Sequence, residues 1–326
     1  MKTLRAKVIQ TTAVLLGATF IAGCGGGGGG SVTQGAIDLI ADYAHSNANP
    51  VPSILDYHDA GITGVSTDNL AAMNVMVDKG VRTDYDTATE IQALSTLIGL
   101  KAVPDRNFGD GVHDFIYGVV TNATTGKTWL NNNLGARYAD ANDANFDPQQ
   151  QSTSPTDFLA YGSLFQWGRR ADGHELMNRT GPHVNSAQHG STAIKSNHPS
   201  NALFIRTSAD WRINPSSALW AGATAINSVC PVGYRLPWGP EISAERLSWG
   251  TPYNMGDAFA STLKWTYVGY RNNQTANVAG AGSNAYYWIA HTKVNNSYYT
   301  HISSIDSTVT NDIERGWGFA VRCIKN

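Results

Sequence analysis

The chain has 326 residues, a formal net charge of −2 at pH 7 and 15% charged side chains, well below the roughly 25% of ordinary domains. Such a weak charge excludes the basic surface that nucleic-acid binding needs, so no nucleic-acid partner is expected. The 33 glycines, 9 tryptophans and 14 tyrosines favour a loop-rich fold with polar and aromatic surfaces, long enough for one large domain and a smaller one.

Residues 1–23 are typical of a secretory signal peptide. Lys2, Arg5 and Lys7 precede an uncharged, mostly apolar stretch from Val8 to Ala22, which is the order of the two regions of such a peptide. The stretch is shorter than the about 20 apolar residues that a membrane-spanning helix needs. We therefore expect export of the chain and removal of this segment.

The segment ends in Ile21-Ala22-Gly23-Cys24, which resembles the lipobox of bacterial lipoproteins. The resemblance implies cleavage before Cys24 and acylation of that residue, by diacylglycerol and palmitate, with a plain secretion signal as the alternative. The glycines that follow make residues 24–32 a flexible linker. Because residue 25 is not Asp, we expect a lipid anchor in the outer membrane by analogy with Gram-negative lipoproteins, and a receptor role favours the cell surface.

Residues 33–103 predict a small helical module that serves as a spacer. Pro50 and Pro52 separate the first two expected helices, because proline interrupts a helix. Ser53 and Thr87 are expected N-caps, and Glu90 lies three residues after Thr87, the spacing of a capping box. Apolar residues at helical spacing place the helices near residues 37–44, 54–61, 69–80 and 88–100.

Residues 104–114 are expected to be a linker, and residues 115–326 a long-looped domain. Strand-like runs, broken by Gly, Asn and Pro, are DFIYGVV, KTWLNNNL, ALFIRT and GFAVRCI. Helices are expected only near Ile242–Leu247 and Gly256–Leu263. The fold class is therefore α+β, with a small N-terminal α-helical module before a domain of few regular elements.

Four stretches of this domain carry a family resemblance: TGKTWLNNNLG at 125–135, AYGSLFQWGRRADGH at 160–174, CPVGYRLP at 230–237 and GWGFAVRC at 316–323. In this order they resemble the Fibrobacter major paralogous domain. The resemblance implies the C-type-lectin-like fold of formylglycine-generating enzymes from about Phe115 to the C-terminus. By their residue types alone the motifs are scaffold, because Trp129, Trp167 and Phe319 supply apolar bulk to a core.

Three cysteines are present. With Cys24 acylated, Cys230 and Cys323 remain as an even pair in an oxidising compartment, which favours a disulfide over two buried thiols. Such a bridge would close a loop of roughly 90 residues, worth about 4–5 kcal/mol. The third and fourth family motifs contain these cysteines, so the resemblance implies the same pair.

Residues 267–317 are crowded with Asn, Tyr, Ser, Thr, His and Asp, and apolar and polar residues partly alternate, as in strands with one solvated face. Tyr and Trp give rigid contact area, while Ser and Asn give adaptable hydrogen bonds. We expect a binding face for a protein or glycan on another cell, a host or a phage. Several of its candidates, Trp317 above all, are expected to be buried. The candidates are Tyr270, Asn272, Asn273, His291, Asn295, Tyr298, Tyr299, His301, Asp306, Asn311, Asp312, Glu314 and Trp317.

The same region resembles the variable region of proteins that diversity-generating retroelements mutate. Mutation of template adenines turns asparagine codons into Tyr, His, Asp, Ser, Thr or Ile codons. Members of that set occur at Asn295, Tyr298, Tyr299, His301, Ile305, Asp306, Thr308, Asn311, Asp312 and Ile313. The alternatives are an Asn-rich surface without mutagenesis and a structural lipoprotein of the cell envelope.

No catalytic residue, metal or cofactor is expected. A formylglycine-generating oxidoreductase uses a close pair of reactive cysteines, whereas Cys230 and Cys323 belong to scaffold motifs. The stretch from Asp140 to Asp147 offers oxygen ligands for calcium but lacks the glycine and glutamate of an EF-hand, so turns are its expected role. Four histidines are expected in loops, His174, His183, His189 and His198. No two of them have the spacing of a zinc-binding motif.

Overall fold

A computed structural model describes residues 33–44, 49–108, 113–222 and 225–326, apart from the side chains of residues 310 and 311. The chain divides into two compact units, residues 1–104 with 147–149 and residues 105–146 with 150–326. The expected signal peptide, Cys24 and the glycine linker lie outside the described residues. Within the described ranges, no helix is long and apolar enough to cross a membrane.

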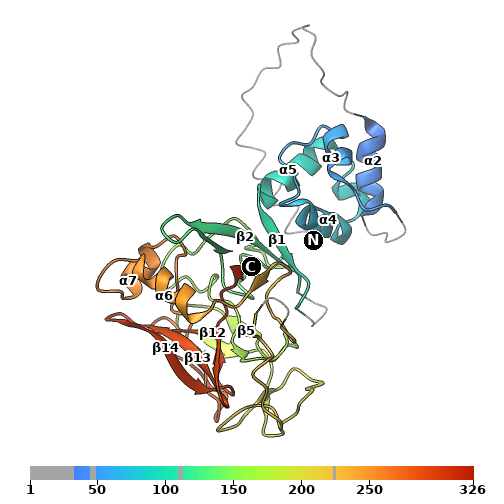
Figure 1. Ribbon diagram of the computed structural model, residues 1–326. Coiled ribbons are helices and arrows are strands. Elements are labelled where there is room, and N and C mark those ends of the chain that lie inside the picture. Colours follow the sequence, from blue (N-terminus) through green and yellow to red (C-terminus); the bar gives the residue numbers. More distant parts are fainter. Residues whose placement is uncertain (1–32, 45–48, 109–112, 223–224) are drawn as a thin grey trace. The chain divides into compact units, whose positions relative to one another are not determined.

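The first unit is helical, which confirms the helices expected there (Figure 1). The Ser53 side chain accepts a hydrogen bond from the backbone N–H of Asp56, and the Thr87 side chain accepts one from Glu90, so both expected N-caps are present. A short 3₁₀ helix was not predicted. The elements are α2 (Gln34–Tyr43), α3 (Ile54–Asp59), α4 (Leu70–Lys79), η1 (Arg82–Asp84) and α5 (Ala88–Ile98).

The start of the expected linker is a strand, β1 (Ala102–Asp105). Asp105 is buried, and its Oδ1 accepts a hydrogen bond from the backbone N–H of Asn107 at 2.9 Å. Burial raises the pKa of this carboxyl to about 7. Phe108 is buried as well. The linker prediction is therefore wrong for these residues, because their burial depends on tertiary partners that local sequence does not reveal.

The second unit begins and ends in one sheet. The strands of this unit in that sheet have the order β2 (Phe115–Asn122), β3 (Lys127–Leu130), β16 (Ile324–Lys325) and β9 (Tyr234–Arg235). The last strand of the unit, β16, therefore lies between β3 and β9. Ile324 is paired with both Trp129 and Arg235. Beside this sheet, Cys230 and Cys323 form a disulfide with Cα atoms 5.9 Å apart, which confirms the expected pair.

Two further antiparallel sheets follow. One has the order β11 (Val278–Ala279), β10 (Tyr270–Arg271), β15 (Gly318–Phe319) and β4 (Phe165–Gln166). The other has the order β12 (Ala285–Lys293), β13 (Asn296–Ile302) and β14 (Ser307–Glu314). Short pairs complete the unit: β5 (Met177–Arg179) with β6 (Asn185–Ala187), and β7 (Ser191–Thr192) with β8 (Phe204–Ile205). Helices and sheets together confirm the α+β class.

Several strands are shorter than the sequence predicts. The run KTWLNNNL ends as a strand at Leu130, and ALFIRT keeps only Phe204–Ile205. The run GFAVRCI is divided between β15 and β16. At the ends of two of these runs a buried side chain bonds the backbone carbonyl, since Arg322 donates to Asn131 and Arg169 donates to Leu203.

Buried arginines supply these bonds. Arg322 donates to the carbonyls of Leu130, Asn131 and Leu263, and Arg179 donates to those of Gly162 and Val268. Burial lowers the pKa of Arg322 to about 10 and that of Arg179 to about 9. Since buried carbonyls need donors, such arginines stabilise loops that lack a regular ladder.

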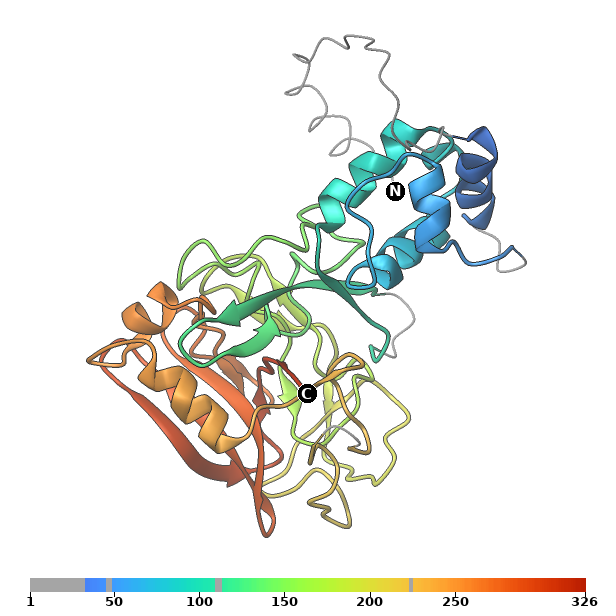
Figure 2. The ribbon, with the colours of Figure 1, turned by 45° about the horizontal axis from the view of Figure 1, so that its top comes forward.

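Two helices, α6 (Gly239–Leu247) and α7 (Met255–Ala260), lie beside the β12–β14 sheet (Figure 2). The second ends earlier than predicted, at Ala260, although Leu263 is still buried. Side chains from the helices and from one face of the sheet meet in the core, which includes Trp129, Ile242, Trp265, Tyr287 and Ile302. The helices therefore cover one face of this sheet.

Candidate functional site

The other face of this sheet, with β10 and β15, carries a cluster of partly exposed aromatic side chains, Tyr270, Tyr286, Tyr299, His301 and Trp317, here named the aromatic face. Tyr286 is central: its ring centroid lies 5.1 Å from Tyr270, 5.9 Å from Tyr299 and 4.6 Å from His301. Trp317 lies 5.5 Å from Tyr270. The cluster forms a continuous aromatic surface.

Strand register brings these side chains together. Tyr286 is paired with His301, and Trp288 with Tyr299, so alternate residues of β12 and β13 point to the same side. Trp288 is buried, and its indole N–H donates to the carbonyl of Phe165 at 2.7 Å. Phe319 is buried 5.1 Å from Tyr286. A fixed apolar layer therefore supports the exposed rings.

The face carries little charge. Burial lowers the pKa of His301, so its ring is mainly neutral at pH 7, and its Nε2 lies 3.1 Å from Oδ1 of Asn284. Burial also raises the pKa of Tyr286. The Trp317 indole N–H donates to Glu314 at 3.2 Å. Rigid neutral rings with polar neighbours are suited to contacts by packing and hydrogen bonding.

The sequence predicted four members of this face, Tyr270, Tyr299, His301 and Trp317. Trp317 remains partly exposed, so the expectation of its burial was wrong. Tyr286, the central ring, was missed. The sequence pattern that could have revealed Tyr286 is the alternation of strand residues within Tyr286-Tyr287-Trp288. Either tyrosine could be the exposed one, however, until it is known which residues form the core.

Two expected residues belong to the opposite, core-facing side of the sheet. The ring of His291 lies 6.2 Å from that of Tyr298 and 4.9 Å from that of Trp238. His291 Nδ1 accepts a hydrogen bond from the backbone N–H of Gly239 in α6, and Tyr298 packs against the core cluster. Their placement in one face with Tyr299 was therefore wrong, because neighbours along a strand point to opposite sides.

The two expected asparagines beside Tyr270 have structural roles. Asn273 is buried. The Oδ1 of Asn272 accepts hydrogen bonds from the backbone N–H groups of Gln274 and Thr275, both at 2.9 Å. This is an Asx turn. Burial corrects the assignment of Asn273 to ligand contact, whereas the assignment of the partly exposed Asn272 stays a prediction.

The remaining expected residues lie around the sheet rather than in the aromatic face. Asn295 and Asp306 are exposed between strands, after β12 and before β14. Asp312 forms an ion pair with Lys293 at 3.2 Å and is paired in register with Tyr298. The side chain of Asn311 lies outside the described part of the chain. Glu314 contacts the face by accepting the hydrogen bond from the Trp317 indole N–H.

Within the described ranges, one group of side chains has the composition of a metal site: Asp172, His174 and Glu175. The backbone N–H of Gln166 donates to Nε2 of His174 at 3.0 Å, so a neutral ring carries its proton on Nδ1. That atom lies 2.8 Å from Asp172 and 3.0 Å from Glu175. A metal would have to displace this proton, and Arg169 already pairs with Asp172. The contacts favour a buried hydrogen-bond network.

His174 thus differs from the loop histidine that was expected, since it lies in a turn but is fully buried. His183, His189 and His198 are exposed. In the possible calcium stretch, Asp140 accepts from the backbone N–H of Asn142, and Asp143 forms an ion pair with Arg137 at 2.6 Å. These oxygens serve turns and an ion pair.

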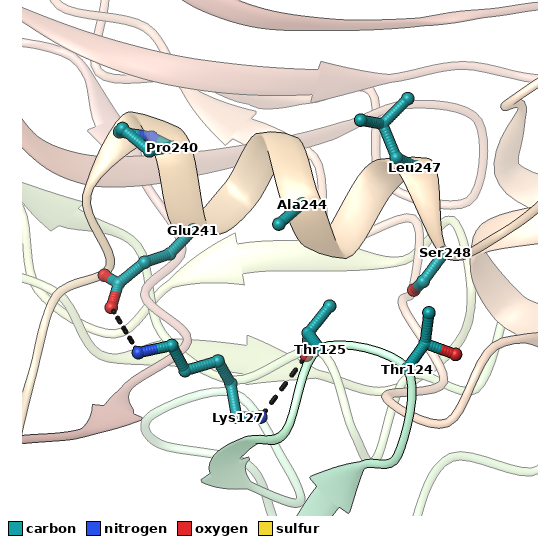
Figure 3. Close-up of a pocket in the computed structure, with 8 residues that line it drawn as sticks. All are labelled: Thr124, Thr125, Lys127, Pro240, Glu241, Ala244, Leu247 and Ser248. Carbon is teal, nitrogen blue, oxygen red and sulfur yellow. Dashed lines mark hydrogen bonds and ion pairs between the residues drawn. The ribbon is translucent and has the colours of Figure 1, made fainter.

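A shallow groove of about 490 Å³ lies between the β2–β3 turn and α6 (Figure 3). Thr124 and Thr125 face Ala244 and Ser248 across it. Its charged groups are already engaged, because Lys127 lies 3.7 Å from Glu241, which also binds Arg235. The groove offers no reactive group.

Reactive thiols are also absent from the described residues, because Cys230 and Cys323 are bonded to each other and buried. This agrees with their assignment to scaffold motifs. Comparison with known proteins found no matching family model, no matching curated protein and no matching solved structure.

Proposed function

We propose that this chain is a lipid-anchored surface protein of the outer membrane that binds a protein or glycan ligand, without catalysis, through its aromatic face. The observation that carries the proposal is the cluster around Tyr286, in which partly exposed rings rest on the buried Trp288 and Phe319. Rigid aromatic side chains provide contact area with little loss of conformational entropy on binding. The ligand would lie on another cell, a host or a phage.

We further propose a C-type-lectin-like fold for the second unit. Three features support it: the pairing of β16 with β3, the Cys230–Cys323 disulfide, and long irregular segments between short strands. In this arrangement the two ends of the unit are fixed in one sheet. The loops and the β12–β14 sheet can then change without loss of the frame.

Diversification by a retroelement is part of the proposal. Tyr299 and His301 are in the aromatic face, and Ile305 and Asp306 are exposed before β14, so adenine mutagenesis would alter a contact surface at these positions. Tyr298 faces the core and would tolerate fewer replacements. We therefore expect sequence diversity to concentrate on the exposed positions, which are Tyr299, His301, Ile305 and Asp306.

The DNA beside the gene tests this directly. We expect a near-identical repeat of the segment that encodes residues 270–314, differing from the gene only at adenines, next to a reverse-transcriptase gene. Finding neither the repeat nor the transcriptase would end the retroelement proposal. Ligand binding by the face would remain open to its own test.

Membrane anchoring is tested with Cys24→Ala. The variant lacks the residue that would carry the acyl chains, and covalent lipids are what would hold the protein at the membrane. We therefore expect it to move from the membrane fraction to the soluble fraction. Ser31→Ala is the matched control, since it changes a residue of the expected linker and keeps both Cys24 and the Cys230–Cys323 disulfide. If Cys24→Ala stays with the membranes, the lipid anchor is not what holds the protein there.

A further inference from the structure

A second groove, of about 360 Å³, lies between α6 and β14 and is lined by Ser243, Arg246, Leu247, Ser307, Thr308 and Val309. None of these residues belongs to the aromatic face. β14 is the outer strand of its sheet, so the groove runs beside a strand edge. Extended peptides bind to proteins at such edges by adding a strand.

Arg246 is held in place within this groove. Its Nε donates to Oγ of Ser307 at 2.7 Å, and its guanidinium carbon lies 4.4 Å from the ring centroid of Tyr253. Tyr253 has a φ of 65°, a conformation that is strained for a bulky residue and occurs preferentially at functional sites. Ser307 in turn donates to the Tyr253 carbonyl. Three elements thus fix the guanidinium before any ligand arrives.

The charge of Arg246 has no counterpart in the part of the chain that the structure describes, where its contacts are Ser307 and Tyr253. Its two terminal nitrogens, Nη1 and Nη2, remain available as donors. A guanidinium presents these N–H groups in a fork that matches both oxygens of a carboxylate. Beside Arg246, Leu247 is 64% exposed and offers an apolar contact.

We propose that this groove binds an extended acidic peptide along β14, with an aspartate or glutamate carboxylate on the Nη atoms of Arg246 and an apolar neighbour on Leu247. The strand edge and the exposed leucine favour a peptide over an acidic glycan, since both fit a chain with alternating side chains. The residues that would bind the peptide side chains, Arg246 and Leu247, come from α6 and lie outside the aromatic face, although Thr308 of the groove is paired in register with His301.

The test titrates the full chain with acetyl-TVEVT-amide and follows NMR signals of the Arg246 Nε–H and the β14 amides. We expect these signals to shift in a saturable manner. The matched peptide acetyl-TVQVT-amide, which has the same shape without the charge, should bind about tenfold more weakly or worse, because charge-assisted hydrogen bonds are roughly twice as strong as neutral ones.

Removing Arg246 also removes its bond to Ser307, so a second variant separates binding from folding. Ser243→Asp adds a negative charge to the groove and leaves both contacts of Arg246 in place, and it should weaken the glutamate peptide about tenfold. Ser186→Asp adds the same charge at an exposed position in β6 and should leave binding unchanged.

Three results would overturn the proposal. The first is no shift at Arg246 with the glutamate peptide at roughly millimolar concentration. The second is equal binding of the glutamate and glutamine peptides, or equal behaviour of the two aspartate variants. The third is binding of trigalacturonate in place of the peptide, which would assign the groove to acidic glycans.

Discussion

Replacing Arg315 with methionine should lower the free energy of unfolding of the second unit by about 3–5 kcal/mol, the usual effect of breaking a buried ion pair from one side. Arg315 and Asp210 are both buried, with Nη1 3.3 Å from Oδ2. The guanidinium also donates to Ser297 and to the carbonyls of Val294 and Asn296. The variant leaves the Asp210 carboxylate without its partner and frees the β12–β13 connection.

Urea unfolding followed by tryptophan fluorescence measures this effect, because all nine tryptophans, from Trp129 to Trp317, lie in the second unit. Lys293→Met is the matched control. Lys293 pairs with Asp312 on the same sheet but is 60% exposed, so its loss should leave the free energy of unfolding almost unchanged, since solvent screens exposed ion pairs. Equal losses in the two variants would show that burial of the Arg315 pair does not matter.

A double variant, Arg315→Met with Asp210→Leu, separates the stranded charge from the lost packing. It removes both charges, so no carboxylate remains buried without a partner. Apolar replacement of a whole buried pair is often neutral or stabilising. We therefore expect the double variant to recover most of the stability that Arg315→Met loses.

Tyr286→Ala should weaken ligand binding by about 30-fold or more, the effect of a central aromatic hot spot of at least 2 kcal/mol. The ring contacts Tyr270, Tyr299 and His301 and rests on Phe319, so its removal also loosens its neighbours. Tyr286→Phe keeps these ring contacts and should bind within a few-fold of the original. Calorimetry with a ligand that the unaltered chain binds measures both variants.

The control for this prediction is Tyr298→Ala. Tyr298 lies next to Tyr299 on β13 but packs against the core on the other side of the sheet. The substitution removes the same side chain and leaves the aromatic face in place. If Tyr298→Ala and Tyr286→Ala weaken binding equally, loss of folding rather than loss of the face would explain the result.

The scaffold was largely predictable, because its signals are local or compositional. Helix caps at Ser53 and Thr87 follow from side chains that can accept backbone hydrogen bonds. Trp129 and Trp167 are too large and apolar to remain outside a core of this size. The disulfide followed from the expectation that Cys24 is acylated, which leaves an even number of cysteines for pairing.

The aromatic face was only partly predictable, because which side chains point to one side of the sheet depends on irregularities in the strand pairing. Pairing in β14 shifts between Val309 and Asn311, so residues before and after this bulge reverse their sides. Asp312 consequently pairs with Tyr298 and not with a member of the aromatic face. A strict two-residue alternation cannot reveal such a reversal, since one extra residue moves every later side chain to the other face.

Buried polar residues were the other failure. His174 and Asn273 are fully or almost fully buried, although their residue types are more often found at the surface. Each is enclosed by segments that are distant in the sequence, as when Arg271 donates to the carbonyl of His174. Only the assembled loops supply the partners that make this burial favourable.

The central claim, that the aromatic face binds a ligand, is tested most directly by equilibrium binding of the purified chain to an array of immobilised glycans, phage particles and outer-membrane proteins. The proposal predicts saturable binding to at least one class, strongly reduced in Tyr286→Ala and retained in Tyr298→Ala. Saturable binding that is unaffected by Tyr286→Ala, or no saturable binding to any of these surfaces, would contradict it.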